Sequence, residues 1–170
     1  MTEPGGCVHW PPGGGIASDP AFIDKLQDVS PDRVGDLLVD SEAAGSRIVR
    51  RLMDEWADGT NRFERPGESL FAAWVVGRLV GVCGLNVDPY AGDDRVGRVR
   101  HLYVLTSLRG RGVGRQLVLR VIDSAGGRFD RLRLRTNNEA AARLYVAMGF
   151  RAFTGAGECT HILELARRAG

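Results

Sequence analysis

The sequence has little lysine, little cysteine and no long apolar run. Lys25 is the only lysine among 23 basic residues, and the three cysteines, Cys7, Cys83 and Cys159, form no CxxC pair. We therefore predict neither a disulfide framework nor a bound metal. No stretch approaches the ~20 apolar residues that span a bilayer, and no basic region followed by an apolar one marks a secretory signal. These absences favour a cytoplasmic protein with reduced thiols and no membrane partner.

Charge is distributed unevenly along the 170 residues, although the net charge is only +2. Residues 1–94 carry eight basic and 16 acidic side chains, whereas residues 95–135 carry 11 arginines and two aspartates. A basic middle segment is compatible with nucleic acid, with a compact polyanion such as a phosphorylated cofactor, or with a solvated surface. The sequence lacks a helix-turn-helix, RNP-type aromatics and a lysine-rich tail, so no nucleic-acid partner is expected.

The hydrophobic pattern predicts one mixed α/β domain over residues 21–168, preceded by a flexible Gly/Pro-rich arm over residues 1–20. The expected order of elements is β-α-α-β-β-β-α-β-α-β-β, with Gly77-Arg78 as a hairpin turn. Helices are predicted over 30–45, 46–58, 112–125 and 138–148. Strands are predicted over 22–29, 70–76, 79–87, 96–104, 131–136, 150–154 and 160–165.

The most informative stretch is the turn between the strand 96–104 and the helix 112–125. It consists of Arg109, Gly110, Arg111, Gly112, Val113, Gly114 and Arg115. A turn of this kind leaves backbone N–H groups free at a helix N-terminus, where the helix dipole favours an anion. Glycines let a phosphate approach the backbone, and arginines add charged donors. The pattern therefore indicates a pyrophosphate site, although tight packing alone would also explain the glycines.

Two blocks of sequence resemble the GNAT superfamily of acyl-CoA-dependent N-acetyltransferases. The run Arg109-x-x-Gly112-x-Gly114 resembles the acyl-CoA signature Q/R-x-x-G-x-G/A of that family. The run Asn138-x-x-Ala141-x-x-Leu144-Tyr145-x-x-x-Gly149-Phe150 resembles its other conserved block. The order of elements over roughly residues 21–166 is also similar. The resemblance implies the GNAT fold, a mixed and mostly antiparallel sheet with flanking helices.

The resemblance also implies how acetyl-CoA, as co-substrate, would be bound. Its pantetheine arm would lie between the strands 96–104 and 131–136 and bond to the backbone of Leu102, Tyr103 and Val104. The pyrophosphate would lie on the amides of residues 109–115. Asn138 would contact the pantetheine arm, and Tyr145 would lie near the thioester sulfur.

An amine acceptor must lose a proton before it attacks a thioester, so the site needs a base and an acid. By analogy with the family Tyr145 is the acid, and the alternative is that it only packs. Many relatives carry a glutamate base on the strand 96–104, but residues 97–101 here contain no carboxylate. His101, His161 and Glu68 are the candidate bases, and deprotonation through a chain of waters is a further alternative.

The acceptor of the resembled family binds between the first two helices, their loop and the far end of the sheet. In this chain that region is acidic, so a cationic small-molecule or peptide amine acceptor is one hypothesis, and a merely solvated acidic surface is the alternative. Its residues include Glu42, Asn61, Phe63, Glu68, Asn86, Asp88 and Tyr90. Because the strand glutamate is missing, a non-catalytic acyl-CoA-binding sensor or regulatory module is the main alternative. Many relatives dimerise, so a homodimer is compatible with the resemblance.

Overall fold

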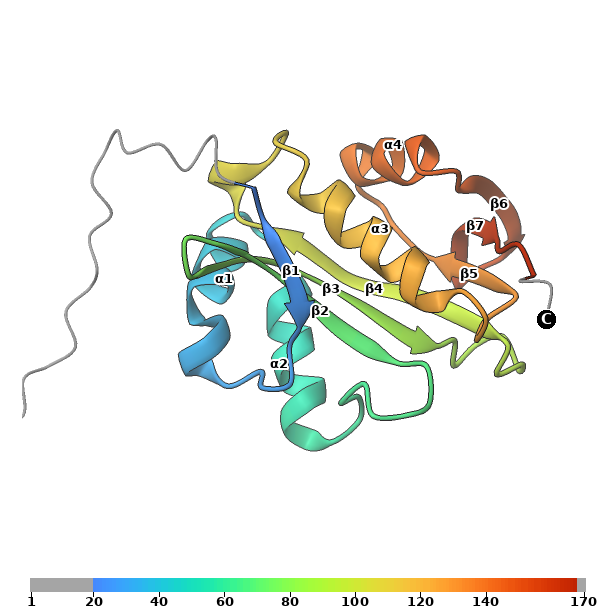
Figure 1. Cartoon of the computed structure of the whole chain (residues 1–170), viewed down its shortest axis with the longest axis horizontal. Coiled ribbons are helices and arrows are strands. Elements are labelled where there is room, and N and C mark those ends of the chain that lie inside the picture. Colours follow the sequence, from blue (N-terminus) through green and yellow to red (C-terminus); the bar gives the residue numbers. More distant parts are fainter. Residues whose placement is uncertain (1–19, 168–170) are drawn as a thin grey trace, which may run out of the picture.

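The computed structural model describes residues 20–167, so the predicted arm, Pro20 apart, lies outside the described residues. A single seven-stranded sheet runs through the protein in the order β1-β2-β3-β4-β5-β7-β6 (Figure 1). The strands are β1 (Phe22–Lys25), β2 (Ser69–Val75), β3 (Arg78–Val87), β4 (Val96–Val104), β5 (Arg131–Leu134), β6 (Arg151–Ala156) and β7 (Cys159–Glu164). The helices are α1 (Pro31–Ala43), α2 (Ile48–Asp58), α3 (Val113–Ala125) and α4 (Glu139–Ala147). The predicted order of elements and fold class are confirmed.

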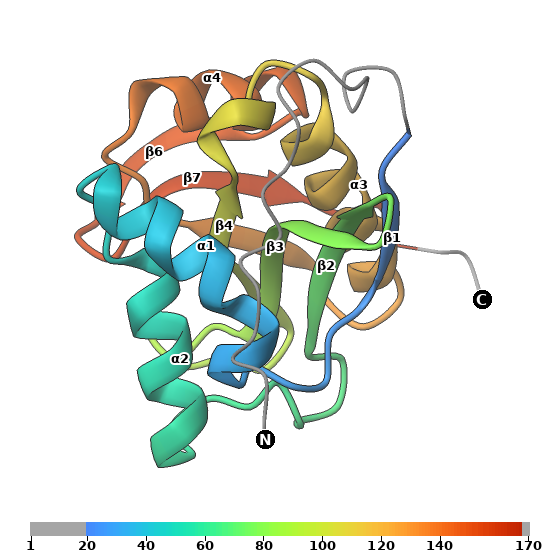
Figure 2. The ribbon, with the colours of Figure 1, turned by 90° about the vertical axis from the view of Figure 1, so that its left-hand side faces the viewer.

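Helices cover both faces of the middle of the sheet, with α1 and α2 on one face and α3 on the other (Figure 2). The glycines of β3 mark the two faces, because a Cβ on Gly81 would meet Leu117 of α3, whereas a Cβ on Gly84 would meet Phe63, which follows α2. Helix α4 lies beside α3, since a Cβ on Gly114 would lie 3.4 Å from Leu144. None of the described helices is long and apolar enough to span a membrane.

Several predicted boundaries were wrong, and strand pairing explains two of them. β1 ends at Lys25 rather than residue 29, because Lys25 pairs with Phe71 near the start of β2 and the chain beyond Leu26 has no strand partner. The hairpin turn consists of Val76-Gly77, since Val75 pairs with residue 78. Both turn residues have positive φ, 49° and 74°, as a two-residue hairpin of this twist requires.

Strand β4 pairs with β5 at only three positions and then separates from it. The parallel pairing runs from Val96↔Arg131 to Arg98↔Arg133, and β4 continues to Val104 paired with β3 alone. A β-bulge accompanies the separation, because Cys83 of β3 faces two residues of β4, His101 and Leu102. A bulge bends its strand and increases the local twist. β4 and β5 therefore diverge towards their C-terminal ends.

A buried carboxylate anchors the last paired position before the strands diverge. The side chain of Asp88, directly after β3, is fully buried, and its Oδ2 lies 3.5 Å from Nη1 of Arg98 and 3.3 Å from Nε of Arg133. Arg98 also donates to the backbone carbonyl of Glu158 over 2.9 Å. Asp88 therefore neutralises two neighbouring arginines, one from each strand.

We expect Asp88→Asn to lower the free energy of unfolding by about 3–5 kcal/mol, because two mostly buried guanidinium groups would lose the carboxylate they share. Urea titration monitored by circular dichroism measures the loss. Asp130→Asn is the matched control, since Asp130 pairs with Arg95 and Arg167 at the surface and exposed pairs contribute little. Equal losses in the two variants would show that Asp88 has no special structural role.

Candidate functional site

The separation of β4 from β5 leaves part of β4 with a free backbone edge. Within the described residues, β4 has no pairing on its β5 side from residue 99 to residue 104, while β5 stays paired with β7. An unpaired strand edge presents N–H and C=O groups to any extended chain laid beside it. The predicted pantetheine contacts, Leu102, Tyr103 and Val104, all lie on this edge.

The Gly-rich turn follows β4 directly and carries a row of free backbone donors. Within the described residues, the N–H groups of residues 110–115 donate to no protein acceptor. Gly110 and Gly112 have φ angles of 76° and 85°, and a Cβ on either would meet open space. Gly112 is the N-cap residue of α3. The turn therefore combines a helix N-terminus, unpaired amides and an unobstructed approach, which is the arrangement that binds phosphates.

The three arginines of this turn are not equivalent. Arg111 and Arg115 are exposed and form no ion pair with a described residue. Arg109 instead folds back, because its Nε donates to the carbonyl of Val104 over 3.2 Å and its guanidinium lies 5.2 Å from the centre of the Tyr103 ring. Arg111 and Arg115 are thus the arginines available to an anion, whereas Arg109 supports the end of β4.

Asp40 of α1 holds the end of β4 from the opposite side. It accepts hydrogen bonds from the hydroxyl of Tyr103 and from Thr106, whose N and Oγ1 lie 3.0 and 2.8 Å away. Burial opposes ionisation of Asp40, but these bonds and the charge of Arg109 outweigh it and lower its pKa. Burial and the Asp40 carboxylate raise the pKa of Tyr103 to about 12. The sequence analysis missed Asp40, since nothing local in the sequence links it to a strand 63 residues away.

The second conserved block places Asn138 and Tyr145 on α4. Asn138 is the N-cap of α4, and its Oδ1 accepts from the N–H of Ala141 over 3.0 Å, which leaves its Nδ2 for a ligand. Tyr145 is 5% exposed and packs edge-on against Phe150. Its hydroxyl forms no hydrogen bond with any described residue. Burial, together with nearby Cys83, raises the pKa of Tyr145 well above 10, so the phenol keeps its proton at neutral pH.

The three candidate bases have different surroundings. Glu68 accepts from the N–H groups of Arg65 and Val87 and from the amide of Asn86, so it holds the loop between α2 and β2 to β3. His161 lies on β7 with its Nδ1 2.9 Å from Oγ1 of Thr160. Neither contact excludes a catalytic role, but Glu68 already has both oxygens in use.

His101 lies on the bulge itself and faces α2. Its Nε2 is 3.3 Å from Oε2 of Glu55, and Glu55 also accepts from Arg100 over 3.0 Å. Burial is the main cause that lowers the pKa of His101. The close contact with His101, with the charge of Arg100, lowers the pKa of Glu55 to about 2 despite partial burial. Glu55 was not predicted from the sequence, because no motif marks it.

The three carboxylates in the region predicted to bind a cationic acceptor are not free, because each of them has a partner within the protein. Glu42 forms an ion pair with Arg50 at 2.8 Å, Glu68 is held by backbone N–H groups, and Asp88 is shared by two arginines. Asn61 and Asn86 bond to each other through their side-chain amides. In this region Glu42 and Asp88 are therefore neutralised by arginines that only the fold brings close.

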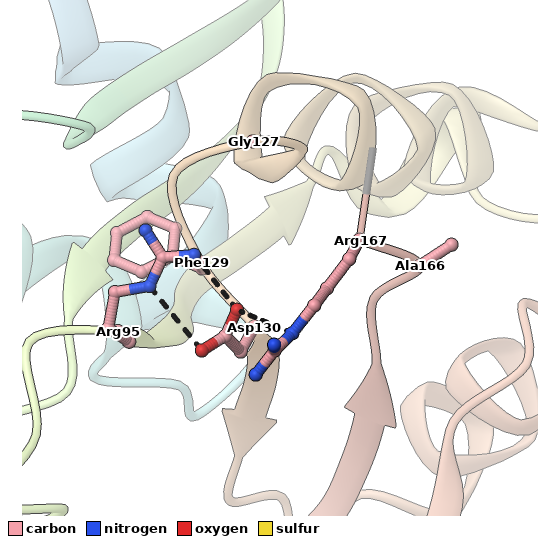
Figure 3. Close-up of a pocket in the computed structure, with 6 residues that line it drawn as sticks. All are labelled: Arg95, Gly127, Phe129, Asp130, Ala166 and Arg167. Carbon is pink, nitrogen blue, oxygen red and sulfur yellow. Dashed lines mark hydrogen bonds and ion pairs between the residues drawn. The ribbon is translucent and has the colours of Figure 1, made fainter. Parts of the chain in front are cut away.

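A surface pocket lies away from these residues, beside the first residues of β4 and β5 (Figure 3). Arg95 and Arg167 both point at Asp130 there, next to Phe129 and Gly127. None of the predicted site residues lines this pocket. It lies at the end of β4 and β5 where the strands are paired, opposite to the free edge.

Known sequences similar to this chain indicate its family. Residues 49–150 match the sequence profile of the Acetyltransferase (GNAT) family. The N-alpha-acetyltransferase RimI of Mycobacterium tuberculosis is 40% identical over 68 residues, which are 36% of this chain and 43% of that protein. A Mycobacterium leprae relative is 41% identical over 116 residues, 59% of this chain and 30% of its own length. The chain thus spans less than half the length of these curated relatives.

Solved structures extend the similarity to nearly the whole chain. A protein from Exiguobacterium sp. 255-15 assigned as an acetyltransferase has a TM-score of 0.76 at 27% identity, over 85% of this chain and 93% of its own. A Salmonella typhimurium protein with the same assignment, solved with its cofactor acetyl-CoA, has a TM-score of 0.62 at 16% identity, over 88% and 96%. At 16% identity, the similarity to the Salmonella typhimurium protein supports the fold only. With the profile match over more than half of its length, the chain belongs to the GNAT acetyltransferase family.

Proposed function

We propose that the protein transfers an acetyl group from acetyl-CoA to a primary amine of a small molecule or peptide. The proposal rests mainly on one observation. The free edge of β4 leads directly into the row of unpaired amides at residues 110–115. An extended pantetheine arm needs backbone partners, and the pyrophosphate attached to it needs an anion site a few ångströms further on. The chain offers both in that order.

In this proposal the backbone of residues 102–104 holds the pantetheine arm, and Nδ2 of Asn138 contacts it from the β5 side. The amides of residues 110–115 and the side chains of Arg111 and Arg115 bind the phosphates. Charge-assisted hydrogen bonds of this kind are about twice as strong as neutral ones. The excess of arginine in residues 95–135 then has a role in cofactor binding.

The chemistry requires that the amine be neutral and that the leaving thiolate receive a proton. An alkylamine with a pKa of ~10 costs roughly 4 kcal/mol to deprotonate at pH 7, whereas a peptide α-amine with a pKa of about 8 costs roughly 1.4 kcal/mol. A backbone N–H near Val104 would stabilise the negative oxygen that forms on the thioester carbon. Tyr145, which stays protonated when buried, would donate to the sulfur.

A non-catalytic acyl-CoA-binding module is the second candidate, and the absence of a carboxylate from residues 97–101 favours it. Both candidates bind acetyl-CoA, so binding alone does not separate them. The 68-residue match to an enzyme named N-alpha-acetyltransferase favours catalysis and points to a peptide α-amine as the acceptor to try first.

We expect the protein to release CoA thiol from acetyl-CoA when a primary amine is present. The acceptors to compare are peptides with free N-termini, amino acids, aminoglycosides and alkylamines, with thiol release followed by a disulfide reagent and acetylation by mass spectrometry. Tight acetyl-CoA binding with no turnover on any acceptor would support the sensor instead. Absence of acetyl-CoA binding would contradict both candidates.

We expect Gly112→Val to weaken CoA binding at least tenfold in calorimetry, because a branched side chain would strain the backbone at φ 85° and stand where a phosphate must approach. Gly127→Val is the matched control. Gly127 follows the other end of α3, has φ 86° and, like Gly112, faces open space. It carries a similar backbone penalty but should leave CoA affinity unchanged. Equal weakening by both variants would mean that strain, rather than a phosphate site, is responsible.

We expect Tyr145→Phe to lower kcat by about 10²-fold or more while the KM for acetyl-CoA stays within a few-fold, since general-acid catalysis contributes about 10²–10⁴-fold. The thermal unfolding temperature should change little, because the hydroxyl bonds to no described residue. Steady-state kinetics and a melting curve test both expectations. An unchanged kcat would leave Tyr145 with a packing role only.

A further inference from the structure

His101 occupies the strained position of the β4 bulge. Its φ angle is 56°, a left-handed conformation that non-glycine residues seldom adopt, although histidine tolerates it better than most. Strained backbone of this kind tends to occur at functional sites. The bulge lies within the free edge of β4, and His101 is adjacent in sequence to the first predicted pantetheine contact, Leu102.

The contact with Glu55 determines which nitrogen of His101 carries the proton. Nε2 of His101 and Oε2 of Glu55 are 3.3 Å apart, but neither buried atom forms a hydrogen bond of good geometry with any residue in the described part of the chain. Two lone pairs that face each other at this distance would repel, which favours the tautomer with hydrogen on Nε2. The lone pair of the neutral ring is then on Nδ1. No described residue forms a hydrogen bond with Nδ1.

Resting on the acetyltransferase function proposed above, we propose that Glu55 and His101 form a dyad in which Nδ1 of His101 is the general base for the amine. Glu55 is a positioning residue, because it holds the ring and selects the tautomer without touching the acceptor. Residues 97–101 contain no carboxylate that could act as the base, and the dyad supplies a proton acceptor in its place.

The charges around the ring favour a neutral base at pH 7. Glu55 stabilises the protonated ring, but burial and the positive charges of Arg100 on β4 and Arg51 on α2 act against protonation, with the net result that the pKa of His101 falls below its usual 6.5. The ring of Phe63, which lies edge-on with its centre 6.3 Å from that of His101, carries no charge. The ring is therefore ready to accept a proton in neutral solution.

The dyad and Tyr145 approach the diverging strands from opposite faces of the sheet. His101 faces α2, on the side where the acceptor of the family binds. Tyr145 comes from α4, which lies beside α3, and it is close to Cys83, whose side chain shares the α3 face with Gly81. A base on one face and an acid on the other flank a thioester held between β4 and β5.

The proton transfers balance in this arrangement. Nδ1 takes one proton from the ammonium group, and the neutral nitrogen attacks the thioester carbon to form a C–N bond. When the C–S bond breaks, Tyr145 gives its proton to the sulfur and regains one from the new amide nitrogen. His101 then releases its proton to solvent. The products are the amide, CoA thiol and one proton.

Nitrogen NMR of the histidine rings tests the dyad without any acceptor. The chain has three histidines, and the signals of His101 are those lost in His101→Asn, a variant that keeps a residue tolerant of positive φ. We expect the Nε2–H tautomer at pH 8 and a titration midpoint below 6.5. Glu55→Gln should shift that midpoint to lower pH, because the ring loses the anion that stabilises its charge. An Nδ1–H tautomer, or a midpoint that Glu55→Gln leaves unchanged, would overturn the proposal.

Kinetics test whether the dyad acts on the acceptor. His101→Asn should lower kcat about 10²-fold or more, and Glu55→Gln should lower it by a smaller factor, both with little change in acetyl-CoA affinity. In Glu55→Gln the acid limb of the kcat–pH profile should also move to lower pH. Asp54→Asn is the control, since it removes the same charge from an exposed neighbour on α2 and should leave rate and profile unchanged.

The outcomes separate this proposal from the proposed function. Turnover that survives His101→Asn, or an acid limb that does not move in Glu55→Gln, would refute the dyad as base while leaving the acetyltransferase intact. Wild-type protein that binds acetyl-CoA but acetylates no acceptor would refute the enzymatic function, and with it the catalytic role of the dyad, whatever the NMR shows.

Discussion

The separation of β4 from β5 is the constraint on which the rest of the site depends. Parallel pairing is kept for three positions and then given up, although every lost backbone pair costs hydrogen bonds unless water or a ligand replaces them. Two features stabilise the divergence. Asp88 neutralises the facing arginines at the last paired position, and the bulge opposite Cys83 bends β4 away from its neighbour.

The free edge is held in place by contacts from both faces of the sheet. On the α1 face Asp40 binds Tyr103 and Thr106, so the strand end and the turn that follows it are both tied to α1. On the other face Val104 packs near Gly81 and Gly114, which ties the strand to the first turn of α3. A pantetheine arm and its pyrophosphate would therefore meet partners whose spacing is already set, which reduces the entropy lost on binding.

The predictions from sequence succeeded where the signal was local. The helices and strands appeared in the predicted order because hydrophobic periodicity reflects which face of each element is buried. The boundaries were wrong where a partner strand decided them, as in β1, which ends when β2 no longer runs beside it. The partners of the carboxylates in the expected acceptor region were missed for a related reason. Counting charge along the chain cannot show that Asp88 will be paired with arginines from β4 and β5.

By itself the sequence determined the family, the order of elements and the turn at residues 109–115, because glycine spacing and periodicity act through dihedral angles and neighbours a few residues apart. Only the tertiary structure decided which groups meet. Asp40 reaches Tyr103 across 63 positions, and Glu55 reaches His101 only because α2 packs on the bulged strand. Such pairings depend on the angle at which a helix crosses a sheet and on one extra residue in a strand, and neither leaves a pattern in the sequence.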